Sequence, residues 1–192
     1  MSTTIDRAFF RRRAVHVAPD LLGKELRHGR CSILISEVEA YSEDDEASHS
    51  HRGPTARNAV MFGPPGLLYV YLCYGIHWCV NIVTGEPGSG EAVLIRAGRV
   101  CEGAEIMRER RPTARRSEDV ANGPGKLTAA LGINRSHNGC DLFDEGSVVS
   151  LGPGVLVPAE TVQISTRIGI TKATEMPWRF SVPVASLSRP VS

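Results

Sequence analysis

The sequence lacks any run of about 18 apolar residues, the length that a membrane-spanning helix requires. Its N-terminal segment carries Arg7, Arg11, Arg12 and Arg13 and continues into mixed sequence, so it has no apolar signal-peptide core. We therefore expect a soluble, cytoplasmic protein. No repeat of about 20–50 residues is present. The 192 residues, 42% of them apolar, can bury a substantial core, so we expect one compact domain over residues 1–192.

Cysteine and lysine are both scarce. The five cysteines are odd in number, include no Cys-x-x-Cys pair, and stand at positions 31, 73, 79, 101 and 140. This spacing supports neither a disulfide framework nor a zinc module, so we expect reduced and mostly packed thiols. The only lysines are Lys24, Lys126 and Lys172.

The net charge is only +1, but the charges are unevenly distributed. Residues 1–30 carry seven Lys/Arg against three acids, and residues 96–116 carry seven Arg against three Glu. An acidic block occupies residues 43–46. The two basic segments can form one surface that faces phosphates. The alternative is that they are ordinary solvated faces.

The order of the expected elements favours an α+β fold. Helices are predicted over residues 15–22, 102–110 and 126–131, although Pro19 lies inside the first. Strands are predicted over residues 32–41, 67–74, 77–83 and 92–97, and near 148–157, 161–168 and 179–184. Residues 67–83 form a hairpin around Gly75, whereas residues 42–66 form a long loop. Hairpins and mixed order favour a mainly antiparallel sheet with flanking helices.

The strand over residues 32–41 carries an unusual pair of glutamates. Alternation places Glu37 and Glu39 on the same face as Ile33, Ile35 and Tyr41. That face is directed to an interior or a cleft, where two carboxylates are costly unless they have a partner or a task. One hypothesis is general-base chemistry. The alternative is that one of them pairs with an arginine.

Three of the four tyrosines, Tyr69, Tyr71 and Tyr74, stand within six residues, and the fourth, Tyr41, is beside the glutamates. Aromatic residues at strand spacing are often core, but stacked tyrosines also hold unpaired bases, and their electron-rich faces favour a cationic ring. Tyr74 adjoins Gly75 at the expected hairpin tip, where a side chain can project as a wedge.

Two further motifs are less specific. His49 and His51 with the nearby acids resemble part of a metal site, but no third ligand stands at a defined spacing. The sequence Asn122-Gly-Pro-Gly-Lys126 at a helix start offers free backbone N–H groups and an ammonium group to a phosphate. The same residues are also ordinary helix-start chemistry.

Taken together, the motifs resemble the alkyladenine (3-methyladenine) DNA glycosylase family with the compact mixed α/β fold. The resemblance runs in order over residues 20–182. Its motifs are Leu21-Leu-Gly-Lys24, Glu37-Val-Glu39-Ala-Tyr41, Ala47-Ser-His-Ser50, Thr55-Ala-Arg-Asn58, Met61-Phe62, Tyr69-Val-Tyr71 with Tyr74-Gly75, Asn81-Ile82, Leu94-Ile-Arg-Ala97, Gly123-Pro-Gly-Lys-Leu127 and Arg167-Ile-Gly-Ile170. It implies a single domain like the C-terminal domain of formyltransferases.

The resemblance also implies a role for each residue of a site. Glu39 would deprotonate a water that Arg96 helps to position. Tyr41, His49 and Tyr71 would hold a flipped base, with Asn81 screening the exocyclic group of a purine, and Tyr74 would fill the gap left in the duplex. Phosphates would be held by Arg57, Gly125, Lys126 and Arg167.

Two departures from the family pattern affect contacts near the wedge. His77 stands where relatives usually have an aromatic residue, and the loop between Tyr41 and His49 is one residue shorter.

The implied partner is double-stranded DNA that contains a damaged purine, so the protein would lie at the nucleoid in a bacterium, without an obligate protein partner. The implied reaction needs no metal, cofactor or covalent intermediate. A lyase would need an amine nucleophile, and none of the three lysines lies in the pocket motifs. Preference among 3-methyladenine, 7-methylguanine, hypoxanthine and ethenoadenine stays open, as does the oligomeric state.

Two other functions remain as alternatives. A non-catalytic damage-recognition module would keep the tyrosines and the basic surface but would not need Glu39. A metal-dependent hydrolase would be built on His49, His51 and the acidic run.

Overall fold

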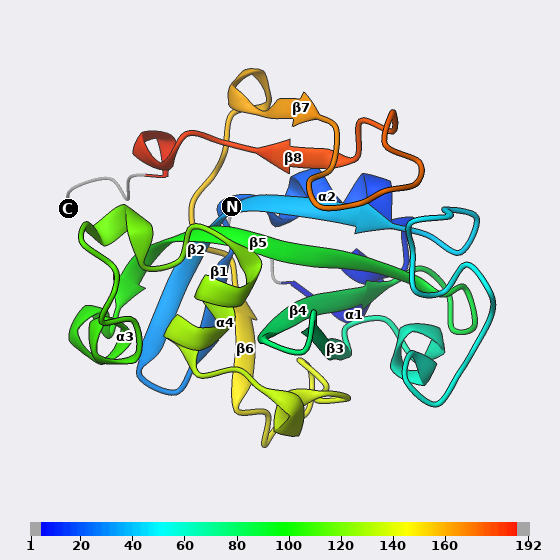
Figure 1. The fold of residues 1–192 in the computed structure, drawn as a ribbon, viewed down its shortest axis with the longest axis horizontal. Helices are drawn as coiled ribbons and strands as arrows, with labels where there is room; N and C mark the ends of the chain where they lie inside the picture. Colours follow the sequence, from blue (N-terminus) through cyan, green and yellow to red (C-terminus); the bar gives the residue numbers. More distant parts are fainter. Residues whose placement is uncertain (1–4, 188–192) are drawn as a thin grey trace.

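An eight-stranded antiparallel sheet forms the centre of the molecule in a computed structural model, which describes residues 5–187 (Figure 1). Six strands lie in the order β3-β4-β5-β2-β1-β6, and β8 pairs with both β2 and β7. The strands are β1 (Glu25–His28), β2 (Cys31–Tyr41), β3 (Leu68–Cys73), β4 (His77–Thr84), β5 (Glu91–Glu102), β6 (Val149–Gly152), β7 (Gln163–Ser165) and β8 (Arg179–Ser181). This curved sheet with flanking helices confirms the predicted α+β fold.

Four α-helices flank the sheet within the described residues: α1 (Arg7–Phe10), α2 (Ala14–Leu21), α3 (Ala104–Arg110) and α4 (Pro124–Leu131). Figure 1 shows α4 in front of the sheet, where it packs on β4 and β5, and α2 behind β2. The buried side chains of α2 recur at helical spacing, and they are Ala14, Val17, Ala18 and Leu21. Pro19 lies inside this helix and lacks the N–H that would donate to the Val15 carbonyl, and the helix ends two residues later at Leu21.

The central strand β2 is more buried than its alternating pattern predicts. Leu34, Val38 and Ala40 are as fully buried as Ile33 and Ile35 on the expected face. The reason is tertiary, because α2 and α3 both pack against this strand. The ladder between β2 and β5 shifts register at Glu37, so an irregularity separates the apolar half of β2 from the half that carries the site.

The β3–β4 hairpin is confirmed, with Tyr71 opposite Cys79 in its register. The Ile76 N–H donates to the Cys73 carbonyl at 3.0 Å and closes the turn. Tyr74 (φ 50°) and Gly75 (φ 70°) both adopt left-handed backbone conformations there. That conformation is uncommon for a residue other than glycine, so the turn holds Tyr74 at the tip against its backbone preference.

Some predicted elements differ in length. The strand predicted over residues 92–97 extends to Glu102, so α3 begins only after Gly103, whose positive φ turns the chain. The three C-terminal strands, β6 to β8, are shorter than predicted. Residues 42–66 contain no strand, as predicted, and one 3₁₀ turn (Ala59–Phe62).

The core lies between the sheet and the helices, and its largest fully buried side chains include Phe10, Leu26, Ile82, Met107 and Leu127. Within residues 5–187, no helix combines the length and the apolar character that crossing a bilayer requires.

Candidate active site

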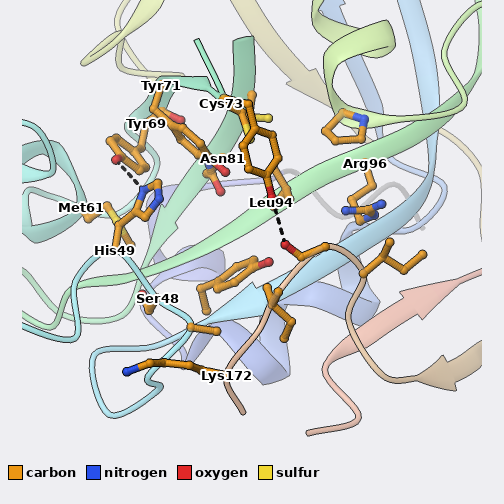
Figure 2. Close-up of a pocket in the computed structure, with 18 of the residues that line it drawn as sticks. Ser48, His49, Met61, Tyr69, Tyr71, Cys73, Asn81, Leu94, Arg96 and Lys172 are labelled. Carbon is orange, nitrogen blue, oxygen red and sulfur yellow. Dashed lines mark hydrogen bonds between the residues drawn. The ribbon is translucent and has the colours of Figure 1, made fainter. Parts of the chain in front are cut away.

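A pocket of about 740 Å³ opens between the end of β2, the β3–β4 hairpin and residues 168–172. Small-molecule sites typically have volumes of about 300–1,000 Å³. Figure 2 shows His49, Tyr69 and Tyr71 together on one side of this pocket and Arg96 on the other. The residues predicted for a site that do line it are Tyr41, His49, Arg57, Tyr71, Tyr74, Asn81 and Arg96. The fold therefore gathers into one pocket side chains that are distant in sequence.

Glu39 lies behind the wall of the pocket, and its side chain is fully buried. Its Oε1 accepts a hydrogen bond from the Ile168 backbone N–H at 2.8 Å. Its Oε2 accepts from the Tyr41 hydroxyl at 2.9 Å and from Arg96 Nη1 at 3.3 Å. All three donors belong to residues that line the pocket. A carboxylate offers about four acceptor positions, so one position is left for a further donor such as a water molecule.

Arg96 connects the two glutamates of β2. Its Nε donates to Glu37 at 2.8 Å, and Glu37 also accepts from Arg179 Nη1 at 3.3 Å. Burial alone would lower the pKa of Arg96, but the Glu39 and Glu37 carboxylates more than offset it and raise the pKa. The guanidinium therefore stays charged. The two explanations for these glutamates were general-base chemistry and pairing with an arginine. Pairing with arginines accounts for Glu37, whereas Glu39 has two donors besides Arg96.

An aromatic cluster forms the opposite wall. The ring of His49 meets that of Tyr71 edge-on at 4.5 Å between centroids, and Tyr69 stacks on Tyr71 at 5.4 Å. His49 Nδ1 lies 2.9 Å from the Tyr69 hydroxyl. Burial raises the pKa of Tyr69 to about 12 and also raises that of Tyr71, so both rings keep their hydroxyl protons. Tyr69 is almost fully buried and belongs to the core as well as to the wall.

His49 is held in its neutral form, because burial and the nearby Arg57 guanidinium lower its pKa below the ordinary 6.5. The unfolded chain then binds more protons than the folded chain, so the stability contributed by neutral His49 is present above about pH 6.5 and is lost as the pH falls. Burial and His28 lower the pKa of His137 in the same way.

We expect the melting temperature to decrease between about pH 7 and pH 5, and to decrease less in His49→Gln than in the wild type. Thermal melting at several pH values measures this. His137→Gln provides the matched control for a histidine outside the pocket and should remove a separate part of the decrease. An equal decrease in the wild type and in His49→Gln would contradict the neutral state of His49.

The structure contradicts the phosphate contact predicted for Arg167. The sequence resemblance implied a phosphate contact, but the guanidinium is fully buried and pairs with Asp45, which is also fully buried. It lies 4.7 Å over the Tyr41 ring and 5.3 Å over the Trp178 ring. A side chain in this position cannot reach a phosphate at the surface. The sequence could not reveal this, because an arginine beside a pocket motif has the same pattern whether it points inward or outward.

Several wall residues were not predicted as site residues. Met61, Cys79 and Leu94 line the pocket, and Asn81, which was predicted, donates to the Tyr69 carbonyl at 3.0 Å. Met61 and Leu94 belong to motifs of the sequence, so the motifs marked both positions as candidates. Only the fold shows that their side chains face the pocket.

Lys172 also lines the pocket, where its Nζ lies 3.3 Å from Glu46. No lysine belongs to the pocket motifs of the sequence, but the fold brings Lys172 to the pocket. Lys172 stands two residues beyond the Arg167–Ile170 motif, in the segment of residues 168–172 that passes beside the pocket.

Tyr74 projects from the hairpin tip with 82% of its surface exposed, and its hydroxyl lies 3.4 Å from the Gly169 carbonyl. Its neighbour Ile76 is also largely exposed. Exposed aromatic and apolar side chains at the mouth of a pocket suggest a surface that contacts another molecule.

The N-terminus of α4 lies beside this hairpin. Pro124 lines the pocket, and the helix has no side-chain cap. Lys126 is exposed, and its Nζ donates to Asn122 at 2.8 Å. His77 packs so closely on Gly125 that a Cβ there would lie 2.7 Å from the His77 side chain. Glycine therefore suits that position, and His77 adjoins the start of α4.

Arg57 is exposed at another side of the mouth. Its guanidinium lies 5.8 Å over the Tyr71 ring. Arg57 and Lys126 thus remain accessible to a phosphate, unlike Arg167.

The N-terminal basic segment is largely neutralised. Four of its six arginines form ion pairs with carboxylates, and the pairs are Arg7–Asp141, Arg12–Asp20, Arg13–Asp44 and Arg27–Glu25. Within the described residues 5–30, the alternative of solvated faces therefore fits better than one shared phosphate surface.

The two histidines considered as metal ligands have separate partners. His49 pairs with Tyr69, whereas His51 Nδ1 lies 3.2 Å from the Glu43 carbonyl. Within residues 5–187, no three His, Cys, Asp or Glu side chains come close enough together to hold a metal ion. The donor set of a metal-dependent hydrolase is not assembled in this part of the chain.

Comparisons with known proteins identify the family of this chain. The family described as methylpurine-DNA glycosylase matches residues 8–185. A relative from Nocardia farcinica is 48% identical over 169 residues, which cover 85% of this chain and 80% of the relative. One from Burkholderia cenocepacia is 45% identical over 184 residues (94% and 88%), and one from Nitrobacter winogradskyi is 46% identical over 191 residues (97% and 88%). Each bears the name "Putative 3-methyladenine DNA glycosylase".

The class defined by the fold and these matches is the DNA glycosylases. The chain belongs to the methylpurine-DNA glycosylase family, which confirms the resemblance drawn from its motifs.

Proposed function

We propose that this protein is a monofunctional DNA glycosylase that releases an alkylated or deaminated purine from double-stranded DNA by hydrolysis and leaves an abasic site. The observation that carries the proposal is the Glu39 carboxylate, held directly behind the wall of an aromatic pocket by hydrogen bonds from Tyr41, Arg96 and Ile168, which line it. Membership of the family supports DNA as the substrate. We place the activity in the cytoplasm, at the DNA.

Access to the base requires that it leave the duplex. Extrusion costs a few kcal/mol, and less for a damaged, poorly paired base. In our proposal the Tyr41 and Tyr71 rings hold the flipped base, His49 contacts its edge, and Asn81 screens the exocyclic group of a purine. Tyr74 fills the vacated space. The neutral imidazole of His49 suits this task, because it keeps one ring nitrogen able to accept and one able to donate.

The chemistry follows from the charges that develop. An alkylated purine leaves readily because departure relieves its positive charge, while the sugar becomes oxocarbenium-like. The Glu39 carboxylate stabilises that positive charge and accepts a proton from the attacking water, and Arg96 orients the water. Burial and the Glu39 carboxylate raise the pKa of Tyr41, so its hydroxyl continues to donate to Glu39.

Three other functions are outcomes of the test. A damage-recognition module would bind lesions without releasing them. A metal-dependent hydrolase would lose activity with a chelator. A lyase that uses Lys172 would form a Schiff base with the abasic sugar.

The deciding experiment is a base-release assay on a panel of duplexes, each with one lesion: 3-methyladenine, 7-methylguanine, hypoxanthine or ethenoadenine. We expect release of at least one base, unchanged by EDTA, and no protein–DNA adduct after borohydride reduction. Binding without release from every duplex would overturn the proposal in favour of the recognition module. An adduct would point to a lysine lyase, which Lys172→Ala then tests.

Lys126→Ala should weaken binding to damaged and undamaged DNA equally. The wild type should bind with a log–log salt slope of several units, because cationic side chains hold phosphates. Loss of one phosphate contact should make this slope shallower by about one unit. Titrations of both duplexes at several salt concentrations measure the slope.

The matched control is Arg12→Ala, which removes an exposed cation that is already paired with Asp20. A loss of affinity confined to damaged DNA would place Lys126 in the base pocket and contradict its assignment to a phosphate.

A further inference from the structure

The ion pair between Arg167 and Asp45 joins three separate segments around the pocket. Besides Asp45, the guanidinium donates to the Ala40 carbonyl at 3.0 Å and to the Ala173 carbonyl at 3.3 Å. Asp45 also accepts the Ala47 N–H at 2.9 Å. The pair therefore holds the end of β2, the loop of residues 42–49 and the segment of residues 167–173 in one arrangement.

Each joined segment carries part of the site. The end of β2 carries Glu39 and Tyr41, the loop carries His49, and the C-terminal segment forms the wall at residues 168–172. The residue directly after Arg167 is Ile168, whose N–H donates to Glu39 at 2.8 Å. The guanidinium lies against the Tyr41 ring, whose hydroxyl donates to the same carboxylate. Of the three residues that donate to Glu39, Ile168 is covalently bonded to Arg167, and Tyr41 lies in contact with its guanidinium.

A buried ion pair is a poor way to add stability. Removing two charges from water costs about as much as their attraction returns, so apolar side chains of similar volume often serve equally well. Arg167 Nε, moreover, is buried without a hydrogen-bond partner. The pair does fix the relative positions of the segments it joins, because a planar guanidinium holds a carboxylate and two carbonyls in a defined geometry.

We propose that Arg167, fixed by Asp45, is a positioning residue for base release: it sets where the Ile168 N–H and the Tyr41 ring meet Glu39. This inference rests on the proposed function and deepens it. Arg167 contacts neither substrate nor water. It acts through two donors that hold the carboxylate in one orientation, with its remaining acceptor position available to the attacking water.

The first test separates positioning from folding. Arg167→Met alone leaves Asp45 buried and unpaired, so it is expected to destabilise the fold. The double variant Arg167→Met/Asp45→Leu removes both charges together. We expect it to melt near the wild-type temperature and to bind a lesion duplex within a few-fold of the wild type. Its single-turnover rate should nevertheless be about 100-fold lower, because small misplacement of a catalytic group has effects of this size.

The matched control is a buried carboxylate outside the pocket. Glu91 accepts the Ala14 N–H and pairs with Arg13. Glu91→Gln should lower the melting temperature while the single-turnover rate of the folded protein stays unchanged. A rate loss equal to that of the double variant would show that general loosening of the fold is the cause.

The second test removes the proposed link itself. Replacing Ile168 by its α-hydroxy acid converts the N–H into an ester oxygen and leaves every side chain in place. Loss of one hydrogen bond to a charged group should lower the single-turnover rate about tenfold or more. Combined with Arg167→Met/Asp45→Leu, the loss should be smaller than the product of the two separate losses, because both changes act on one contact.

The outcomes distinguish a failure of the proposed function from a failure of the role proposed for Arg167. If the wild type releases no base from any duplex, the proposed function fails, whatever Arg167 does. If the wild type is active and the double variant has a wild-type rate, or if the two losses multiply fully, Arg167 does not act through Ile168 and this inference is overturned.

Discussion

Glu39→Gln should abolish base release while the variant still binds a lesion duplex within a few-fold of the wild type. Glutamine has the same shape, and its amide oxygen can still accept the Ile168 N–H. It can neither take a proton from water nor offset the positive charge that develops on the sugar. A general base typically contributes about 10²–10⁴-fold, so a loss of at least this size is expected. Single-turnover rates, with affinities measured separately, decide the question.

Glu37→Gln is the matched control for this prediction. Glu37 lies two residues away on the same strand and shares Arg96, but its second partner is Arg179, whereas Glu39 accepts from Tyr41 and Ile168, which line the pocket. Its rate should decrease much less. Near wild-type single-turnover rates in Glu39→Gln would require a different catalytic group.

Tyr74→Ala should impair excision from duplex DNA far more than excision from single strands. The Tyr74 ring stands at the tip of the β3–β4 hairpin, almost wholly exposed, on a backbone held in the left-handed region. From there it can enter the base stack and fill the space that the flipped base leaves. This offsets part of the unstacking cost, which is absent when the base is already unpaired.

Tyr71→Ala provides the contrast on the same hairpin. Tyr71 lies within β3 and lines the pocket, so its loss should damage both substrates by removing a stacking face worth roughly 1–3 kcal/mol. Single-turnover rates of both variants on both substrates measure the difference, and thermal melting identifies any folding defect. Equal losses for Tyr74→Ala on duplex and single strands would remove the wedge assignment.

The fold was largely predictable because its strongest signals are local. Alternation and β-branched residues predicted β2, and Tyr74-Gly75 predicted the hairpin turn. The errors lie where tertiary contacts override local pattern. β5 runs beyond its predicted end because it pairs with β2 as far as Glu102, and β2 is buried on both faces because helices pack against it.

The site was predictable in part. Motif order identified the residues that line the pocket, including Tyr41, His49, Tyr71 and Arg96. It did not reveal that Arg167 turns inward to Asp45 or that Lys172 reaches the pocket. Both residues belong to an irregular segment, where no periodicity indicates the direction of a side chain.

By itself, then, the sequence determined the family, most of the strands except β1 and the chemical types of the site residues, because these depend on order and on spacing along one segment. Only the tertiary structure decided which side chains meet. Glu39 acquires its donors from β2, from β5 and from Ile168, which stands 129 positions away in the chain. Contacts between such distant positions follow from the packing of the whole domain, so no local pattern encodes them.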